Sequence, residues 1–157
     1  MSGPMRRSTL LPAPLGTRVS TTVVAGFPGA GKTTLIRGWL ASKPAGERWA
    51  VLVNDTGPLG IDAGLLPEDA VAQVAGGCAC CAARVALGAG LTRLLRRGPW
   101  DRLLIELSGL GHPGPLVDQL RGGSLAAMLQ IDEIVAVVDA GRIETQFRGA
   151  HRDLAVA

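Results

Sequence analysis

Five short stretches of the chain are rich in apolar and β-branched residues and are bounded by Gly, Pro or polar residues. Runs of this length and composition are typical of strands that are buried on both faces of a parallel sheet. They cover Val19–Val24, Trp49–Val53, Ala70–Val74, Trp100–Ile105 and Ile131–Val138. The last run, like the others, is therefore expected to be a buried strand.

Helix-compatible segments separate these runs. They are expected after residue 34 through Leu40, over Arg84–Arg97, from Pro113 to about Leu120, over a short segment with Met128 for which Ser124 is a candidate cap, and from Arg142 towards Phe147. The arginines in the last turns of the second segment are read as a solvated helix face. Strands that alternate with helices predict an α/β domain with a largely parallel sheet flanked by helices.

The stretch from Gly26 to Thr34 reads G-F-P-G-A-G-K-T-T and matches G-x-x-x-x-G-K-[ST] at every fixed position. It follows the first predicted strand and precedes the first helix, which is the context of a phosphate-binding loop. The fold class is therefore that of a P-loop NTPase. The residues expected to bind a nucleotide are Gly26, Gly29, Ala30, Gly31, Lys32, Thr33 and Thr34.

The chemistry of a triphosphate explains this spacing. Glycines allow a tight turn whose backbone N–H groups converge on phosphate oxygens, and the helix that follows presents its positive end to them. Lys32 reaches the β- and γ-phosphate oxygens, which makes it a catalytic candidate, and the hydroxyl of Thr33 can take a Mg²⁺ position. A Gly-rich turn without a ligand is the structural alternative.

Composition narrows the possible partners. With 157 residues the chain is expected to form one globular domain, and 47% hydrophobic residues are enough for a core. Aromatic residues make up only 3%, and the net charge is only +3, so neither base stacking nor a basic surface points to nucleic acid. Of the 16 basic residues only Lys32 and Lys43 are lysines, and the first lies in the loop.

The first residues, 1–17, mix Pro, Ser, Thr and Gly without periodicity and are expected to be a flexible leader before a domain that covers residues 18–157. No run approaches the roughly 18 apolar residues that a membrane span needs. These observations predict a soluble, cytoplasmic protein without membrane or nucleic-acid partners.

Three cysteines, Cys78, Cys80 and Cys81, lie within four residues. This spacing is poor for a disulfide framework and good for a shared metal, so a reducing compartment and a Zn²⁺ site are favoured, with a fourth ligand not evident. A redox pair of adjacent cysteines would be strained, and three small buried residues are the structural alternative.

Glu106 and Gly109 follow the apolar run that ends at Ile105. An acid at the end of a strand can hold the Mg²⁺ of a phosphate loop or orient the attacking water, and a glycine N–H can contact the γ-phosphate. Asp55 follows another strand and is a further candidate Mg²⁺ ligand. His112 is interpreted as an ordinary loop residue.

The order of G-F-P-G-A-G-K-T-T, V-N-D-x-G, G-G-C-A-C-C and E-L-S-G-L resembles the CobW-like GTPases, a metallochaperone group with HypB and UreG as relatives. The resemblance covers about Arg18 to Gly141, and the C-x-C-C is its most specific part. It implies a domain that binds GTP with Mg²⁺, carries Zn²⁺ or another divalent metal, and uses GTP hydrolysis to deliver that metal to a client protein.

The chain departs from the family pattern at three points. The family's N-E-F-G-E reads N-D-T-G-P here, so Asp55 is a shortened acid and Pro58 replaces the second one. No N-K-x-D is present, so GTP and ATP are expected to compete within about tenfold. The C-terminal domain of typical members is also missing, which predicts a truncated member with an incomplete GTPase domain.

Two other functions remain open from the sequence. The chain could be a non-catalytic remnant that binds metal and nucleotide, or a P-loop kinase for a small molecule. Phosphate release from GTP and ATP, with and without Zn²⁺, separates the GTPase from both alternatives. The client protein, the physiological metal and the oligomeric state are not determined by the sequence.

Overall fold

The computed structural model describes residues 18–54, 60–61, 65–74, 81–107 and 113–144. In these residues five parallel strands form one sheet in the order β3-β2-β4-β1-β5. The strands are β1 (Val19–Gly26), β2 (Trp49–Asn54), β3 (Val71–Val74), β4 (Arg102–Leu107) and β5 (Leu129–Val137). The helices are α1 (Lys32–Ala41), α2 (Cys81–Leu95), α3 (Pro113–Arg121) and α4 (Gly123–Met128), with a 3₁₀ turn η1 (Glu68–Ala70). The predicted α/β class is confirmed.

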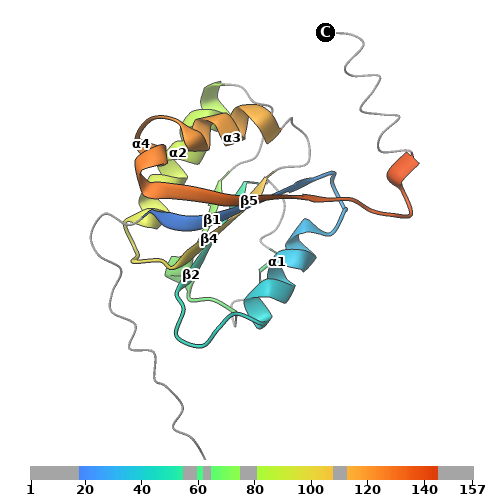
Figure 1. The fold of residues 1–157 in the computed structure, drawn as a ribbon, viewed down its shortest axis with the longest axis horizontal. Helices are drawn as coiled ribbons and strands as arrows, with labels where there is room; N and C mark the ends of the chain where they lie inside the picture. The colour runs from blue at the N-terminus through green and yellow to red at the C-terminus, as the bar shows by residue number, and fades with distance from the viewer. Residues whose placement is uncertain (1–17, 55–59, 62–64, 75–80, 108–112, 145–157) are drawn as a thin grey trace, which may run out of the picture.

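Helices cover both faces of the sheet. Figure 1 shows α1 on one face and α2, α3 and α4 on the other. Parallel strands need crossover connections, and helical crossovers lie on the faces of the sheet. The central strands β2 and β4 are consequently buried over almost their whole length, which explains their continuous apolar sequences.

The order of the strands decides which loops meet. Strand β4 enters the sheet between β1 and β2 although it follows both in sequence. Its register pairs Glu106 with Val24 of β1 and with Val53 of β2. The carboxyl ends of these three strands therefore lie side by side, at the edge of an open α/β sheet where ligands bind.

Helix α2 shows how the core is built. Leu87, Leu91 and Leu94 lie at helical spacing and have no exposed surface, because this side of the helix packs on β2 and β3. The opposite side carries Val85, which is 72% exposed. Trp100, just before β4, is buried and donates its indole N–H to the carbonyl of Leu94 at 2.9 Å, so it joins the end of α2 to the start of the next strand.

The expectation of a buried fifth strand is wrong. Strand β5 begins at Leu129 and pairs with β1, and it is the outermost strand on its side of the described sheet. Most of its side chains are exposed or half-buried, including Ile134 at 45%. An apolar run identifies a strand but does not say whether the strand has a neighbour on each side.

Several predicted boundaries also differ. Helix α2 begins at Cys81 and ends at Leu95, so Arg96 and Arg97 follow the helix rather than complete it. Strand β4 includes Glu106, which the sequence had suggested as a residue after the strand. The candidate cap is wrong as well, because Gly122 holds the N-cap position of α4 and no side chain caps that helix.

No helix in the described part of the chain combines the length and the apolar composition needed to span a bilayer.

The packing of α2 gives a stability prediction. Leu91→Ala should lower the free energy of unfolding by about 2–5 kcal/mol, because it removes buried methyl groups and leaves a cavity against the sheet. Val85→Ala, on the exposed side of the same helix, should change it by less than about 0.5 kcal/mol. Urea unfolding followed by circular dichroism measures both, and equal losses would contradict the packing described here.

Candidate functional site

The loop between β1 and α1 depends on glycine at its fixed positions. Gly26 and Gly31 have positive φ angles of 149° and 98°, and these are conformations that residues with a Cβ rarely adopt. A Cβ at Gly26 would also collide with the carbonyl oxygen of Val137 on β5. The backbone of the neighbouring strand thus explains why the loop begins with glycine.

The first turn of α1 follows directly on this loop and supplies no acidic residue of its own. Gly31 is the N-cap, no side chain caps the helix, and the first turn contains no acidic residue. The first N–H groups of a helix have no partner within the helix and carry partial positive charge. The N-terminal end of α1 is therefore suited to bind an anion such as a phosphate.

Lys32 is buried, with 5% of its surface exposed, although it carries a charge. Its Nζ donates to the carbonyl oxygens of Gly26 and Phe27, both at 3.1 Å. These bonds hold the ammonium group inside the loop. A phosphate oxygen carries more negative charge than a carbonyl oxygen and would be a stronger acceptor for the same group.

The structure brings Thr33 and Glu106 into direct contact across 73 residues of sequence. The Thr33 hydroxyl donates to the carboxylate of Glu106, with Oγ1 2.7 Å from Oε1 and 3.0 Å from Oε2. Glu106 is only 3% exposed, because it lies within β4 between two other strands. Hydroxyl and carboxylate oxygens are ligands that suit Mg²⁺, so these two residues fit the ion.

Asn54, at the end of β2, is buried, and its Oδ1 has no hydrogen-bond partner in the described part of the chain. The preceding residue, Val53, is the register partner of Glu106. A buried polar atom without a partner costs about 1–3 kcal/mol. A bound ligand or an ordered water at this strand end would offer a donor.

Four of the predicted site residues lie outside the described residues: Asp55, Cys78, Cys80 and Gly109. His112 does too. Cys81 is described only as the first residue of α2. No group of three or more His, Cys, Asp or Glu side chains that could share a metal occurs among the residues that the structure covers. The thiolate site therefore stays a prediction.

Sequence reasoning missed Arg142. The Nη2 of this residue donates to the carbonyl of Gly29 in the loop at 3.3 Å, and its Nε donates to Oδ2 of Asp139 at 2.7 Å. The hydrogen bond from Arg142, together with the N–H of Gly141, holds the pKa of the Asp139 carboxyl below its usual range. The sequence signal was an Asp-x-Gly turn after an apolar run. The pairing of β5 with β1 brings this turn, and with it Arg142, to the loop.

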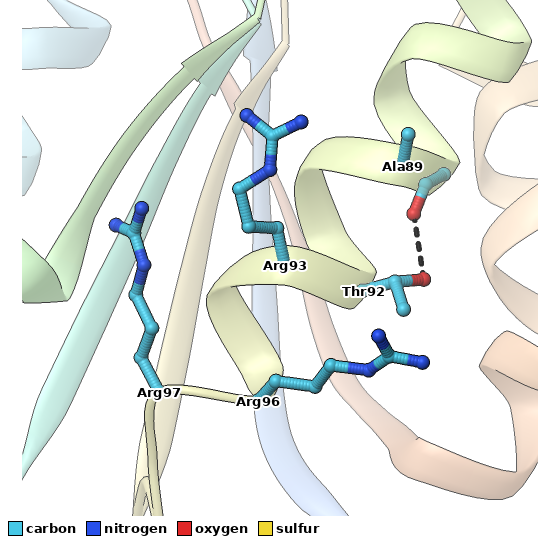
Figure 2. A pocket seen from close by; sticks show the side chains of 6 residues that line it. Ala89, Thr92, Arg93, Arg96 and Arg97 are labelled. Carbon is cyan, nitrogen blue, oxygen red and sulfur yellow. Dashed lines mark hydrogen bonds between the residues drawn. The ribbon is translucent and has the colours of Figure 1, made fainter.

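A hollow of about 470 Å³ lies elsewhere on the molecule. Figure 2 shows it over the C-terminal half of α2, where the Thr92 hydroxyl donates to the carbonyl of Gly88 at 2.8 Å. Its lining residues are Gly88, Ala89, Thr92, Arg93, Arg96 and Arg97. The three arginines are exposed, as expected, although only Arg93 belongs to the helix. Because α2 leads from β3 to the start of β4, this hollow lies at the opposite end of the sheet from the loop.

Comparison with known proteins agrees with this geometry. The model of the family "CobW/HypB/UreG, nucleotide-binding domain" matches residues 20–156. The zinc chaperone YeiR of Escherichia coli is 41% identical over 121 residues, which are 76% of this chain and 37% of that protein. The zinc chaperone CobW of Pseudomonas aeruginosa is 35% identical over 90% of this chain and 40% of its own length.

A more distant relative and a solved structure extend the comparison. The zinc-regulated GTPase metalloprotein activator 1 of Schizosaccharomyces pombe is 33% identical over 87% of this chain and 34% of its own length. Zinc-bound YjiA GTPase from E. coli superposes with a TM-score of 0.57 at 28% identity, over 85% of this chain and 44% of that one. The chain thus spans about two fifths of the length of these proteins.

A variant of Lys32 tests the loop. Lys32→Ala should weaken binding of Mg²⁺-GTP by roughly 10- to 150-fold, because a charge-assisted hydrogen bond is lost while the backbone of the loop stays. Lys43→Ala removes the other lysine, which bonds to the carbonyl of Glu47, and should bind like the wild type. Isothermal calorimetry on the three proteins measures this, and equal affinities would refute the assignment of Lys32.

Proposed function

The chain belongs to the CobW/HypB/UreG nucleotide-binding-domain family, and on this premise we propose that it binds and hydrolyses GTP and passes a zinc ion to a client protein. The observation that carries the proposal is the contact between Thr33 and Glu106 beside the phosphate loop. Relatives that are named zinc chaperones and a zinc-regulated GTPase support the metal and the nucleotide.

Each group at the loop has a proposed role. Residues Gly26 to Thr34 surround the phosphates, and Lys32 leaves the loop carbonyls for the β- and γ-oxygens when the nucleotide binds. Thr33 and Glu106 hold Mg²⁺, with Asp55 as a further candidate, and the ion would neutralise charge on the phosphates. Gly109 offers its backbone N–H to the γ-phosphate.

Asn54 adds a hydrogen-bond acceptor to these groups. Its Oδ1 is buried at the end of β2 and lacks a partner in the described residues. We propose that it accepts a hydrogen bond from a water in the shell of the Mg²⁺ or near the γ-phosphate. This role would explain why a polar side chain is kept in a buried position.

The zinc cargo is proposed to bind Cys78, Cys80 and Cys81. Thiolates are preferred zinc ligands, and three cysteines within four residues could supply three of them to one ion. A reduced thiolate site is consistent with a cytoplasmic location.

Phosphate release from GTP and ATP, measured with and without Zn²⁺, tests the proposed activity. GTP should be hydrolysed. Glu106→Gln should lower the rate roughly 10- to 100-fold, because it removes the charge of a side chain that is proposed to hold the Mg²⁺ ion. Glu133→Gln, an exposed carboxylate on β5, should match the wild type. No release from either nucleotide would favour the non-catalytic alternative, and transfer to a small acceptor would favour a kinase.

Metal and nucleotide binding should be coupled. Strand β3 precedes the cysteines in sequence and β4 carries Glu106, and the two strands run parallel in one sheet. A loop that responds to the γ-phosphate could therefore also change the thiolate site. Coupling is reciprocal and typically about 1–3 kcal/mol, so GTP should shift Zn²⁺ affinity by roughly 5- to 150-fold. Cys80→Ser should lower Zn²⁺ affinity more than Asp55→Asn does.

Competition with a chromogenic zinc chelator, in GTP, in GDP and without nucleotide, measures this coupling. The same Zn²⁺ affinity in all three conditions would exclude it. A Cys80→Ser protein that binds zinc like the wild type would move the cargo site away from the cysteines.

A further inference from the structure

Arg142 joins the end of β5 to the phosphate loop, although 113 residues separate it from Gly29 in the sequence. One side of its guanidinium donates to the Gly29 carbonyl at 3.3 Å and the other donates to the Asp139 carboxylate at 2.7 Å. A planar guanidinium with several donors suits this kind of bridge, whereas a single ammonium group is less well matched to two acceptors in different directions.

The turn that carries Arg142 is itself closed by hydrogen bonds. Asp139 accepts from the N–H of Gly141 through Oδ1 at 2.9 Å, and its carbonyl accepts from the N–H of Arg142 at 3.0 Å. The hydrogen bonds from Arg142 and from the Gly141 N–H hold the pKa of the Asp139 carboxyl below its usual range. The direction of the arginine side chain is therefore determined by its own turn as well as by the loop.

Gly29 leaves room for the guanidinium. It has a left-handed φ of 73°, and a Cβ at this position would lie 3.3 Å from Nη2 of Arg142. That separation is tighter than ordinary van der Waals contact. Glycine here accommodates both the turn of the loop and the close approach of the arginine.

The position of Arg142 also adds charge. Lys32 lies inside the loop, whereas the Arg142 side chain is 58% exposed at its rim. A cation at the rim of an anion site attracts the ligand with the higher negative charge more strongly, and salt weakens this attraction.

We propose that Arg142 is a positioning residue of the phosphate loop. It holds the Gly29 carbonyl so that the loop keeps the shape that accepts a polyphosphate, and its charge favours the triphosphate over the diphosphate. The inference about affinity rests on the nucleotide binding proposed above, while the inference about the loop does not.

The first experiment measures GTP and GDP affinity of the full chain with Mg²⁺. Arg142→Gln should weaken GTP binding about three- to tenfold, the loss expected for one partly exposed hydrogen bond and its charge, and should weaken GDP binding less. Arg142→Lys should recover part of the loss. Asp139→Asn removes the charged anchor without touching the loop, and its GTP affinity should lie between those of Arg142→Gln and Arg142→Lys. Arg96→Gln, at the far end of the sheet, should bind like the wild type.

The second experiment needs no nucleotide. Hydrogen exchange of the Ala30 and Gly31 amides in the free protein should be faster in Arg142→Gln than in the wild type and unchanged in Arg96→Gln. Equal exchange in Arg142→Gln and wild type overturns the proposal, as does equal GTP affinity when the wild type binds GTP. If no form of the protein binds GTP, the proposed function fails, and the exchange rates still decide the role of Arg142.

Discussion

The parallel pairing of β1 with β4 is the contact on which the candidate site depends. Strand β1 ends in the phosphate loop, and β4 carries Glu106 in register with Val24, two residues before the loop begins. Because β4 lies between β1 and β2, its carboxylate is buried and still reaches the hydroxyl of Thr33. Without this insertion Glu106 would not lie beside the strand that leads into the loop and on to Thr33 in α1.

The same edge of the sheet gathers several groups whose burial would otherwise be unfavourable. A lysine, a glutamate and an asparagine are almost fully buried there, and among the residues that the structure describes the only other buried polar ones are two threonines. Buried charges are stable when other groups bond to them, and Lys32 bonds to loop carbonyls while Glu106 accepts from Thr33. Such concentrations of buried polar groups are typical of binding sites.

The outer strands are related to the site in a different way. Strand β5 contributes little to the core, and much of its length is exposed. Its pairing with β1, however, extends to the loop, where Val137 lies opposite Gly26 and the following turn brings Arg142 to Gly29. Strand β5 thus limits the loop sterically through the Val137 carbonyl, and the turn that follows it acts on the loop electrostatically through the Arg142 guanidinium.

The sequence by itself determined the local features. The motif from Gly26 to Thr34 specifies its own turn and the start of α1, because glycine conformations and helix ends depend on neighbouring residues. Apolar runs and helical spacing identified the strands and most of the helices for the same reason. The candidate roles of Lys32, Thr33 and Glu106 followed from the motif and from a strand end nearby.

Only the tertiary structure decided which distant groups meet. The contact of Thr33 with Glu106, the exposure of β5 and the approach of Arg142 to Gly29 depend on strand order and register, and many orders are compatible with the same apolar runs. The interior position of Glu106 within β4 is likewise a property of its two neighbouring strands. A pattern along the chain depends on neighbouring residues, and it shows which of them are buried. The site is instead formed by hydrogen bonds between β1, β4, β5 and the loops that follow them, and these segments are distant in sequence.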